Sequence, residues 1–157
     1  MSGVRSELAL TPAQVLAAIP QREPFRFVDE ILEIDDECVV ASYRWREDAD
    51  FYRGHFPGNP VTPGVLLVES MAQAGVVALG LFLLARHSSP ADFEKLVTVF
   101  TDASVEFSGL VRPGDRVRIT GRKVFYRRRK LRSRVEMCLE DGSVVCAGVL
   151  SGMGVPR

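Results

Sequence analysis

The sequence predicts an α+β fold in which one antiparallel β-sheet wraps around a single long α-helix. Two observations lead to this prediction. The stretch 74–85 is apolar at every position, so a helix formed there must be buried on all sides. The last third of the chain alternates β-rich segments with tight turns such as Asp141-Gly142, a pattern typical of antiparallel hairpins. A sheet curved around the helix would cover both apolar surfaces.

Two helices are expected. Thr11 is suited to cap a short helix over 13–19, with Pro12 at the first helical position. The central helix is expected from about Pro63 to Arg86. Thr62 would be its N-cap, and Pro63 would occupy the first helical position, where an amide hydrogen would be unpaired in any case.

The remaining apolar and β-branched segments are expected to be strands, separated by turns at the acidic cluster 35–37 and at Pro113-Gly114-Asp115. No repeat or long linker interrupts them, so residues 1–157 are expected to form one domain. The expected strands are 25–34, 38–45, 96–107, 116–120, 131–139 and 144–153.

Composition excludes several classes of function. The formal net charge is zero, so no global field attracts the chain to nucleic acid or to a membrane. Residues 1–7 lack the apolar segment of a signal peptide. The uncharged apolar run inside the central helix covers roughly a dozen residues, which is too short to span a bilayer. We therefore expect a soluble cytoplasmic protein without a membrane span.

The three cysteines, Cys38, Cys138 and Cys146, show no metal-ligand spacing. Each lies in a β-like apolar stretch, so we expect small buried hydrophobic residues and no metal site.

A proline-stiffened loop followed by the central helix carries the main functional candidates. The loop contains His55, one of two histidines in the chain, and the helix contains Glu69, the only ionisable side chain between His55 and Arg86. A carboxyl group inside an apolar helix loses hydration, which raises its pKa. The two residues are thus candidates for an acid/base pair. The alternatives are a solvent-facing Glu69 favoured by the helix dipole and a purely structural His55.

One run of basic residues, 126–134, is expected to be the solvated tip of a hairpin, because exposed charge usually needs no partner. The functional alternative is a docking patch for an acidic protein. Nucleic acid is disfavoured, since the run has one neighbouring aromatic residue, no recognised binding motif and a neutral chain behind it.

Three segments carry a resemblance to a known family. They are Gly54-His55-Phe56-Pro57-Gly58, Pro63-Gly64-Val65-Leu66 and Glu69-Ser70-Met71-Ala72-Gln73. Together they resemble the signature of the hot-dog-fold (3R)-hydroxyacyl-[acyl-carrier-protein] dehydratases of fatty-acid synthesis (FabZ-like). The likeness continues through 19–29, 105–107 and 112–115. The sister branch that also isomerises the double bond has aspartate in place of Glu69, so the glutamate favours plain dehydration.

The resemblance implies a hot-dog fold and a specific chemistry. His55 would remove the α-proton of a 3-hydroxyacyl thioester, and Glu69 from the partner subunit of a homodimer would protonate the departing hydroxyl group. The Gly64 amide would bind the thioester oxygen, with Val65, Phe56 and Gln73 completing the oxyanion and substrate-binding site. No metal or redox cofactor is implied, because no electrons change hands.

The resemblance also implies partners. The substrate would be carried by acyl carrier protein, with Arg127, Arg128 and Arg129 as candidate docking residues, and its acyl chain would lie in an apolar tunnel beside the central helix. In many relatives the dimers assemble further into a trimer of dimers.

Two departures from the family affect the substrate. The usual His-Arg-Tyr-Pro is Gln21-Arg22-Glu23-Pro24 here, and an ungapped count from Val105 places Thr98 where relatives often carry a tunnel-gating tyrosine. Acyl-length preference is therefore not transferable, and a specialised lipid or polyketide pathway is an alternative to primary fatty-acid synthesis. Two alternative functions keep the fold: thioester hydrolysis, and a non-catalytic acyl-binding subunit.

Overall fold

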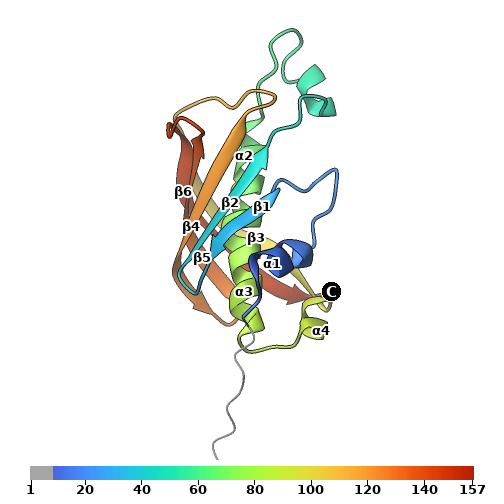
Figure 1. Cartoon of the computed structure of the whole chain (residues 1–157), viewed down its shortest axis with the longest axis vertical. Coiled ribbons are helices and arrows are strands. Elements are labelled where there is room, and N and C mark those ends of the chain that lie inside the picture. The colour runs from blue at the N-terminus through green and yellow to red at the C-terminus, as the bar shows by residue number, and fades with distance from the viewer. Residues whose placement is uncertain (1–8) are drawn as a thin grey trace, which may run out of the picture.

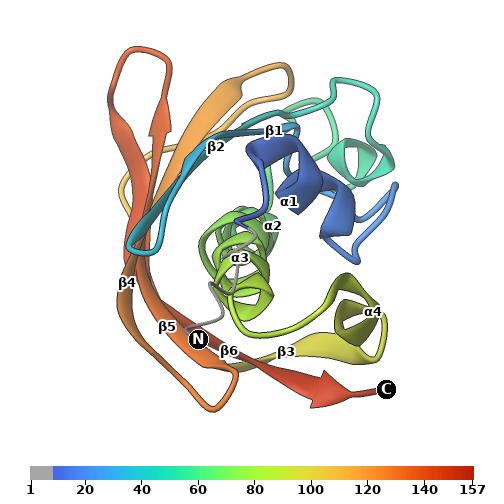
Figure 2. The ribbon, with the colours of Figure 1, turned by 60° about the horizontal axis from the view of Figure 1, so that its bottom comes forward.

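A computed structural model describes residues 9–157 as an antiparallel sheet curved around one long helix. The six-stranded sheet has the order β1-β2-β4-β5-β6-β3, and every neighbouring pair is antiparallel. Figure 2 shows the sheet wrapping around the helix, with α1 and α4 on its open side. The predicted fold class is confirmed. The expectation for residues 1–7 lies outside the described part of the chain.

The elements follow one another along the chain as labelled in Figure 1. The helices are α1 (Pro12–Ala18), the 3₁₀ helix η1 (Asp50–Arg53), α2 (Gly64–Ala72), the π-helix η2 (Gln73–Ala78), α3 (Leu79–Ala85) and α4 (Pro90–Phe93). The strands are β1 (Glu30–Ile34), β2 (Cys38–Arg44), β3 (Leu96–Phe107), β4 (Arg116–Arg127), β5 (Lys130–Leu139) and β6 (Val144–Pro156).

The central helix is formed by α2, η2 and α3 in succession, as the apolar stretch predicts. Its start differs from the prediction. Pro63 is the N-cap, and the Thr62 hydroxyl group pairs with the Tyr52 hydroxyl group at 2.6 Å instead of capping the helix. The first turn therefore has no side-chain cap.

The length of this helix also corrects an expectation. The 22-residue segment Gly64–Ala85 is long and apolar enough to cross a membrane, so the apolar run is not too short once the whole helix is counted. However, 67% of its most hydrophobic window is buried inside the fold. This burial is what a core helix of a soluble fold requires.

At the π-helical turn, the backbone of η2 lies directly against the backbone of β4. A Cβ atom on Gly121 of β4 would lie 2.8 Å from the Cα atom of Gly75, so only glycine allows this approach. The Ser133 hydroxyl group of β5 donates to the Gly75 carbonyl oxygen at 2.7 Å. This bond satisfies a carbonyl group in a segment where the regular α-helical hydrogen bonding changes.

The expected strand over 25–34 is too long, because only Glu30–Ile34 forms β1. The backbone of Asp29 still bonds to Ser42 of β2, but the backbone of Phe25 and Phe27 bonds to helix side chains. The Gln73 amide group accepts from the Phe27 nitrogen at 2.8 Å and donates to the Phe25 oxygen at 2.9 Å. The Ser70 hydroxyl group donates to the Phe27 oxygen at 2.8 Å. These bonds replace a β-ladder at Phe25 and Phe27 and fasten this part of the segment to α2 and η2.

The other expected strands are present: β3 has the expected bounds, β2 ends one residue early at Arg44, and β4, β5 and β6 are longer than expected. Strand β4 continues past residue 120 to Arg127, and the basic run 126–134 spans a hairpin tip, as expected. The cysteines lie in β2, β5 and β6 as expected, but only Cys146 is buried. Cys38 and Cys138 are half-buried at the strand surfaces, so the expectation of full burial is wrong for these two.

The sheet has one long unpaired edge. Strand β3 is at the end of the strand order, and most of its residues are exposed on both faces.

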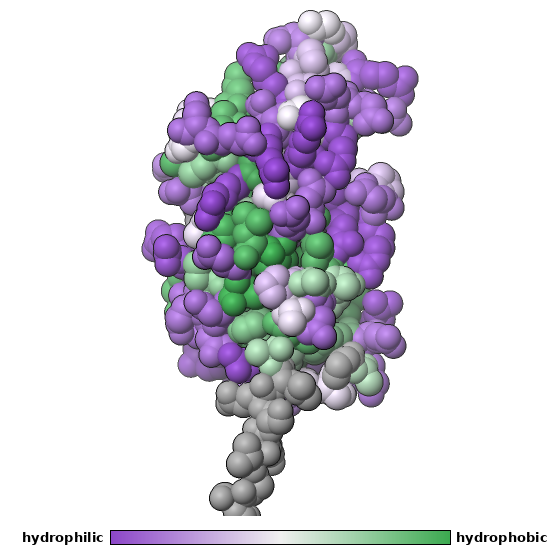
Figure 3. All heavy atoms as spheres, in the orientation of Figure 1, coloured by the Kyte–Doolittle hydropathy of each residue, from purple (hydrophilic) through white to green (hydrophobic). Residues whose placement is uncertain are grey.

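Figure 3 shows apolar residues gathered at mid-height of the visible face, near β1, β2 and α1, and a mainly hydrophilic upper end that carries the 45–62 loop.

Candidate functional site

His55 is held by a short loop that folds back on itself beyond η1. Its backbone nitrogen donates to the Phe51 oxygen at 3.0 Å, and its backbone oxygen accepts from the Val61 nitrogen at 2.9 Å. The His55–Phe56 peptide bond is cis, and the two rings stack with centroids 4.0 Å apart. The imidazole is half-buried.

The hydrogen bond of the ring defines its tautomer. His55 Nδ1 lies 2.7 Å from the Val61 carbonyl oxygen. Because a carbonyl oxygen can only accept, Nδ1 carries the proton and Nε2 is left with a free lone pair. The loop thus presents an imidazole oriented to accept a proton at Nε2.

Glu69 lies in α2 and is half-buried, which is intermediate between the buried acid and the solvent-facing residue considered from sequence. Burial raises the pKa of its carboxyl group above the ordinary value, and a hydrogen bond from Gln73 partly opposes this rise. Among the described residues, Gln73 is the hydrogen-bond partner of the Glu69 side chain, and its Nε2 donates to Oε1 at 3.0 Å. The raised pKa favours a proton-donating role.

Gln73 has a different place from the one predicted. Its side chain is fully buried and bonds at once to Phe25, Phe27 and Glu69. A group with all these bonds inside the fold is not open to substrate. Gln73 instead orients the Glu69 carboxyl group and fastens the 25–27 segment to the helix.

The residues at the helix start are accessible. Val65 is 77% exposed and Phe56 is 51% exposed. Gly64 is half-buried, and a Cβ atom there would lie 3.1 Å from the Phe107 ring, so glycine keeps the first turn open. With Pro63 as N-cap, no side chain occupies the amide groups of this turn. Such free amides at a positive helix end can bind an oxyanion.

One chain does not assemble the acid/base pair. Within residues 9–157 no hydrogen bond joins His55 to Glu69, and each is held by other groups of its own segment. The 45–62 loop, which carries His55, extends beyond the start of α2, the helix that carries Glu69 (Figure 1). Within residues 9–157 no group of three His, Cys, Asp or Glu side chains is arranged to hold a metal ion.

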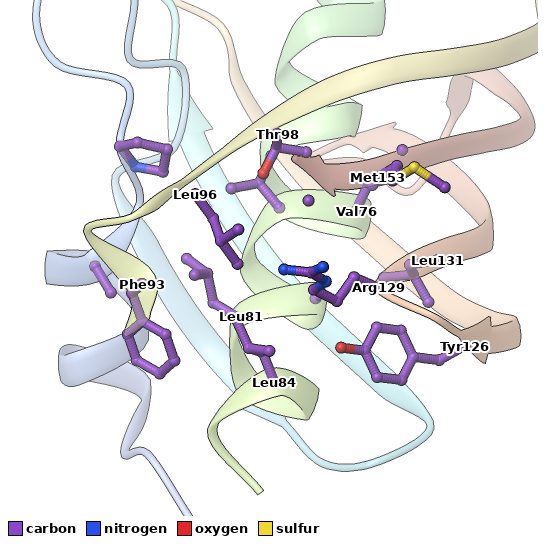
Figure 4. A pocket seen from close by; sticks show the side chains of 16 residues that line it. Val76, Leu81, Leu84, Phe93, Leu96, Thr98, Tyr126, Arg129, Leu131 and Met153 are labelled. Carbon is purple, nitrogen blue, oxygen red and sulfur yellow. The ribbon is translucent and has the colours of Figure 1, made fainter. Parts of the chain in front are cut away.

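A pocket of about 60 Å³ lies beside the second half of the central helix. Thr98, which the sequence singled out, lines it together with residues that sequence reasoning missed. The helical spacing of Val77, Leu81 and Leu84 was the available signal, because side chains three or four residues apart share a helix face. The pocket is completed by side chains of α4, β3 and the β4–β5 hairpin (Figure 4).

The candidate docking residues are found at the β4–β5 hairpin. Arg127 ends β4, and its guanidinium lies 6.0 Å from the Phe125 ring centroid. Arg128 and Arg129 form the turn itself. All three are exposed, and they lie far along the central helix from the His55 loop of the same chain (Figure 1).

A sheet wrapped around one central helix, with a histidine loop at the helix start, defines a hot-dog-fold protein. Solved structures with this fold include the dehydratase heterocomplex ApeI:P from Xenorhabdus doucetiae, with a TM-score of 0.73 and 16% identity over 94% of this chain and 93% of that one. A thioesterase from Haemophilus influenzae has a TM-score of 0.66 and 15% identity over 96% and 94% of the two chains. At such identities the likeness shows the fold alone.

Sequence comparison is more specific. The FabA-like domain matches residues 19–150. The 3-hydroxyacyl-[acyl-carrier-protein] dehydratase FabZ of Streptococcus pneumoniae is 36% identical over 140 residues, which is 88% of this chain and 93% of that protein. The same-named protein of Oenococcus oeni is 37% identical over 107 residues, or 68% of this chain and 72% of that protein. The chain belongs to the FabA-like family, and the resemblance drawn from its motifs is confirmed.

Proposed function

We propose that this protein dehydrates (3R)-3-hydroxyacyl-[acyl-carrier-protein] to the trans-2-enoyl thioester in fatty-acid or related lipid biosynthesis. The observation that carries the proposal is the oriented imidazole of His55, in a chain that belongs to the FabA-like family and is 36% identical to a FabZ dehydratase. Glu69 complements it as a carboxyl group whose pKa burial raises.

The reaction requires two proton transfers. His55 Nε2 takes the α-proton, and the electrons of that C–H bond form the new double bond. Glu69 gives its proton to the 3-hydroxyl group, which leaves as water. Negative charge that develops on the thioester oxygen is stabilised by the free amides at Gly64 and Val65. Phe56 stacks on the imidazole and flanks the substrate, whereas Gln73 positions the acid.

The pair is completed by a second copy of the chain. Strand β3 is twelve residues long and pairs with β6 along one side only, so its other edge is open, and Val99 is 42% and Phe100 47% exposed. A long open edge of this kind is a template for pairing with another strand. We propose that two β3 strands pair in a homodimer, which brings His55 of one protomer to Glu69 of its partner. Further assembly into a trimer of dimers remains part of the proposal.

The activity is tested by giving the purified protein a 3-hydroxyacyl thioester and following the ultraviolet absorbance of the conjugated enoyl product. Parallel assay of free thiol separates dehydration from hydrolysis. We expect enoyl product without thiol release. Thiol release would favour a thioesterase, and binding without either product would favour a non-catalytic acyl-binding subunit. No feature of the site favours these two alternatives.

The protein is proposed to act in the cytoplasm as one domain. Acyl carrier protein is proposed to dock through the positive charge of Arg127, Arg128 and Arg129. The triple Arg→Ser variant is expected to raise KM for carrier-linked substrate at low salt. KM for the matching pantetheine thioester serves as the control, because it lacks the acidic carrier. An unchanged KM for the carrier-linked substrate would make the run a solvated hairpin tip.

A further inference from the structure

The turn between β4 and β5 has an unfavourable backbone for its residues. Arg128 and Arg129 have φ values of 52° and 61°. Two-residue hairpin turns with positive φ at both positions favour Asn-Gly, because most side chains clash in this conformation. Strain of this kind is retained where the side chain or the local geometry has a function. The two arginine side chains face different surroundings.

Arg129 is fixed on the side of the turn that faces the pocket beside the central helix. Its backbone oxygen accepts from the Gly154 nitrogen of β6 at 3.0 Å. Its aliphatic stem lies over Gly154, where a Cβ atom would stand 3.7 Å from the Arg129 Cβ. Figure 4 shows the guanidinium extending from there into the pocket. Arg128 instead borders a different hollow, with Phe125 and Lys130.

The pocket combines apolar walls with unpaired hydrogen-bond donors. One wall consists of Leu81, Leu84, Phe93 and Leu96. The Arg129 guanidinium and the Tyr126 hydroxyl group project toward this wall from the hairpin (Figure 4). Within residues 9–157 the side chains of the exposed Arg129 and the half-buried Tyr126 form no hydrogen bond or ion pair, and no carboxylate lines the pocket.

The two donors are also electrostatically linked. Burial raises the pKa of the Tyr126 phenol, and the charge of Arg129 acts in the opposite direction. The positive charge thus lies close enough to the phenol to favour negative charge in the pocket. A ligand group that accepts from both would satisfy donors that the protein itself leaves unpaired.

We propose that this pocket receives the far end of the substrate's acyl chain and that Arg129, aided by Tyr126, selects chains that end in a carboxylate. The inference deepens the proposed function and rests on it. A planar guanidinium binds a carboxylate through paired hydrogen bonds. A terminal methyl group would displace water from both donors and could not accept the hydrogen bonds that the water had accepted.

The position of the pocket fits the far end of a chain. Its helix residues run from Val76 to Leu84, which are 7 and 15 positions beyond Glu69. At 1.5 Å per helical residue, the pocket lies roughly 10 to 22 Å along the helix from the proposed acid. An extended acyl chain whose 3-hydroxyl group lies at the proposed acid would run along α3 over this distance.

The test uses two unreactive ligands of the same chain length. Both are acyl-pantetheine thioethers, one ending in a methyl group and the other in a carboxylate. Their dissociation constants are measured by calorimetry for the wild type, Arg129→Asn and Arg128→Asn. Asparagine tolerates positive φ, so both variants keep the turn. Arg128→Asn is the matched control, because it changes the same residue type in the same turn outside the pocket.

The wild type and Arg128→Asn are expected to bind the carboxylate-ended ligand at least about tenfold more tightly than the methyl-ended one, and Arg129→Asn is expected to lose this preference. Equal or tighter binding of the methyl-ended ligand by the wild type would overturn the inference, as would a preference that survives Arg129→Asn. Because neither ligand can react, the result is independent of dehydration. Failure of the enoyl assay with an intact preference would refute the proposed function alone.

Discussion

The two ends of the central helix differ in how much of a binding site a single chain forms. At the Gly64 end, the first-turn amides are uncapped, Phe56 and Val65 are exposed, and His55 and Glu69 are not joined within one chain. At the α3 end, one chain supplies every wall of the pocket. Under the proposed function, the proton transfers would be shared between subunits, whereas the proposed pocket for the end of the acyl chain is lined by residues of one chain.

The largest expected effect concerns the reactive end. His55→Ala and Glu69→Gln should each lower kcat for a 3-hydroxyacyl thioester by about 10³-fold or more, since each removes one partner of the two proton transfers. Initial rates of enoyl formation measure this. His87→Ala is the matched control, because His87 is the other histidine, is exposed, and follows the far end of α3. Wild-type turnover in either site variant would remove that residue from the mechanism.

The link between the fold and the acid is tested through Gln73. Gln73→Leu should lower the free energy of unfolding by about 2–4 kcal/mol, because it leaves buried backbone groups of Phe25 and Phe27 unpaired. It should also raise the pKa of Glu69, since the hydrogen bond that lowers this pKa is lost. Chemical denaturation and the pH dependence of kcat measure the two effects.

The higher pKa of Glu69 in Gln73→Leu should shift the pH dependence of activity. If protonated Glu69 is the acid, activity falls as pH rises through its pKa, so the alkaline limb of the Gln73→Leu profile should move to higher pH. Ser70→Ala is the control, because it removes another bond to Phe27 without touching Glu69. An unmoved limb in Gln73→Leu, or an equal shift in Ser70→Ala, would limit Gln73 to a structural role.

Features of the fold and the candidate site could be predicted from sequence where they depend on local patterns, and not where they depend on contacts between residues far apart in the chain. The central helix was predictable because its residues are apolar all round, and His55 and Glu69 could be proposed as an acid/base pair because their motifs are local. The segment 25–27 was mispredicted as strand, since the backbone of Phe25 and Phe27 bonds to Gln73, 46 to 48 residues away. The direction of Arg129 also depends on a distant contact, with Gly154, which the local basic run does not reveal.

At the Gly64 end of the helix, the dependence of protein stability on pH tests the raised pKa of Glu69. Because the folded-state pKa of Glu69 is raised, the folded protein loses stability as pH rises above the ordinary glutamate value and the buried group ionises. Glu69→Gln should therefore have a higher Tm than the wild type at neutral pH, with the difference diminishing in acid, where both states are protonated. Thermal unfolding at several pH values measures this. A difference that grows toward acid would contradict the raised pKa.

The smallest expected effect concerns the hairpin at the pocket end. Arg128→Asn should raise the free energy of unfolding by about 0.5–1 kcal/mol, because asparagine is better suited to positive φ than arginine. Chemical denaturation measures the change. Arg127→Asn is the comparison, as this residue lies in β4 and has no strain to relieve. An equal gain in both variants would point to reduced charge repulsion in the basic run as the cause.

The central claim, a site shared by two subunits, is tested most directly by mixing the His55→Ala and Glu69→Gln proteins. After unfolding and refolding together, half of the dimers should contain one chain of each kind, and each such dimer should hold one intact His55–Glu69 pair. Activity should return to about a quarter of the wild-type value, as a two-fold symmetric dimer requires. A refolded mixture as inactive as its two components would contradict a shared site.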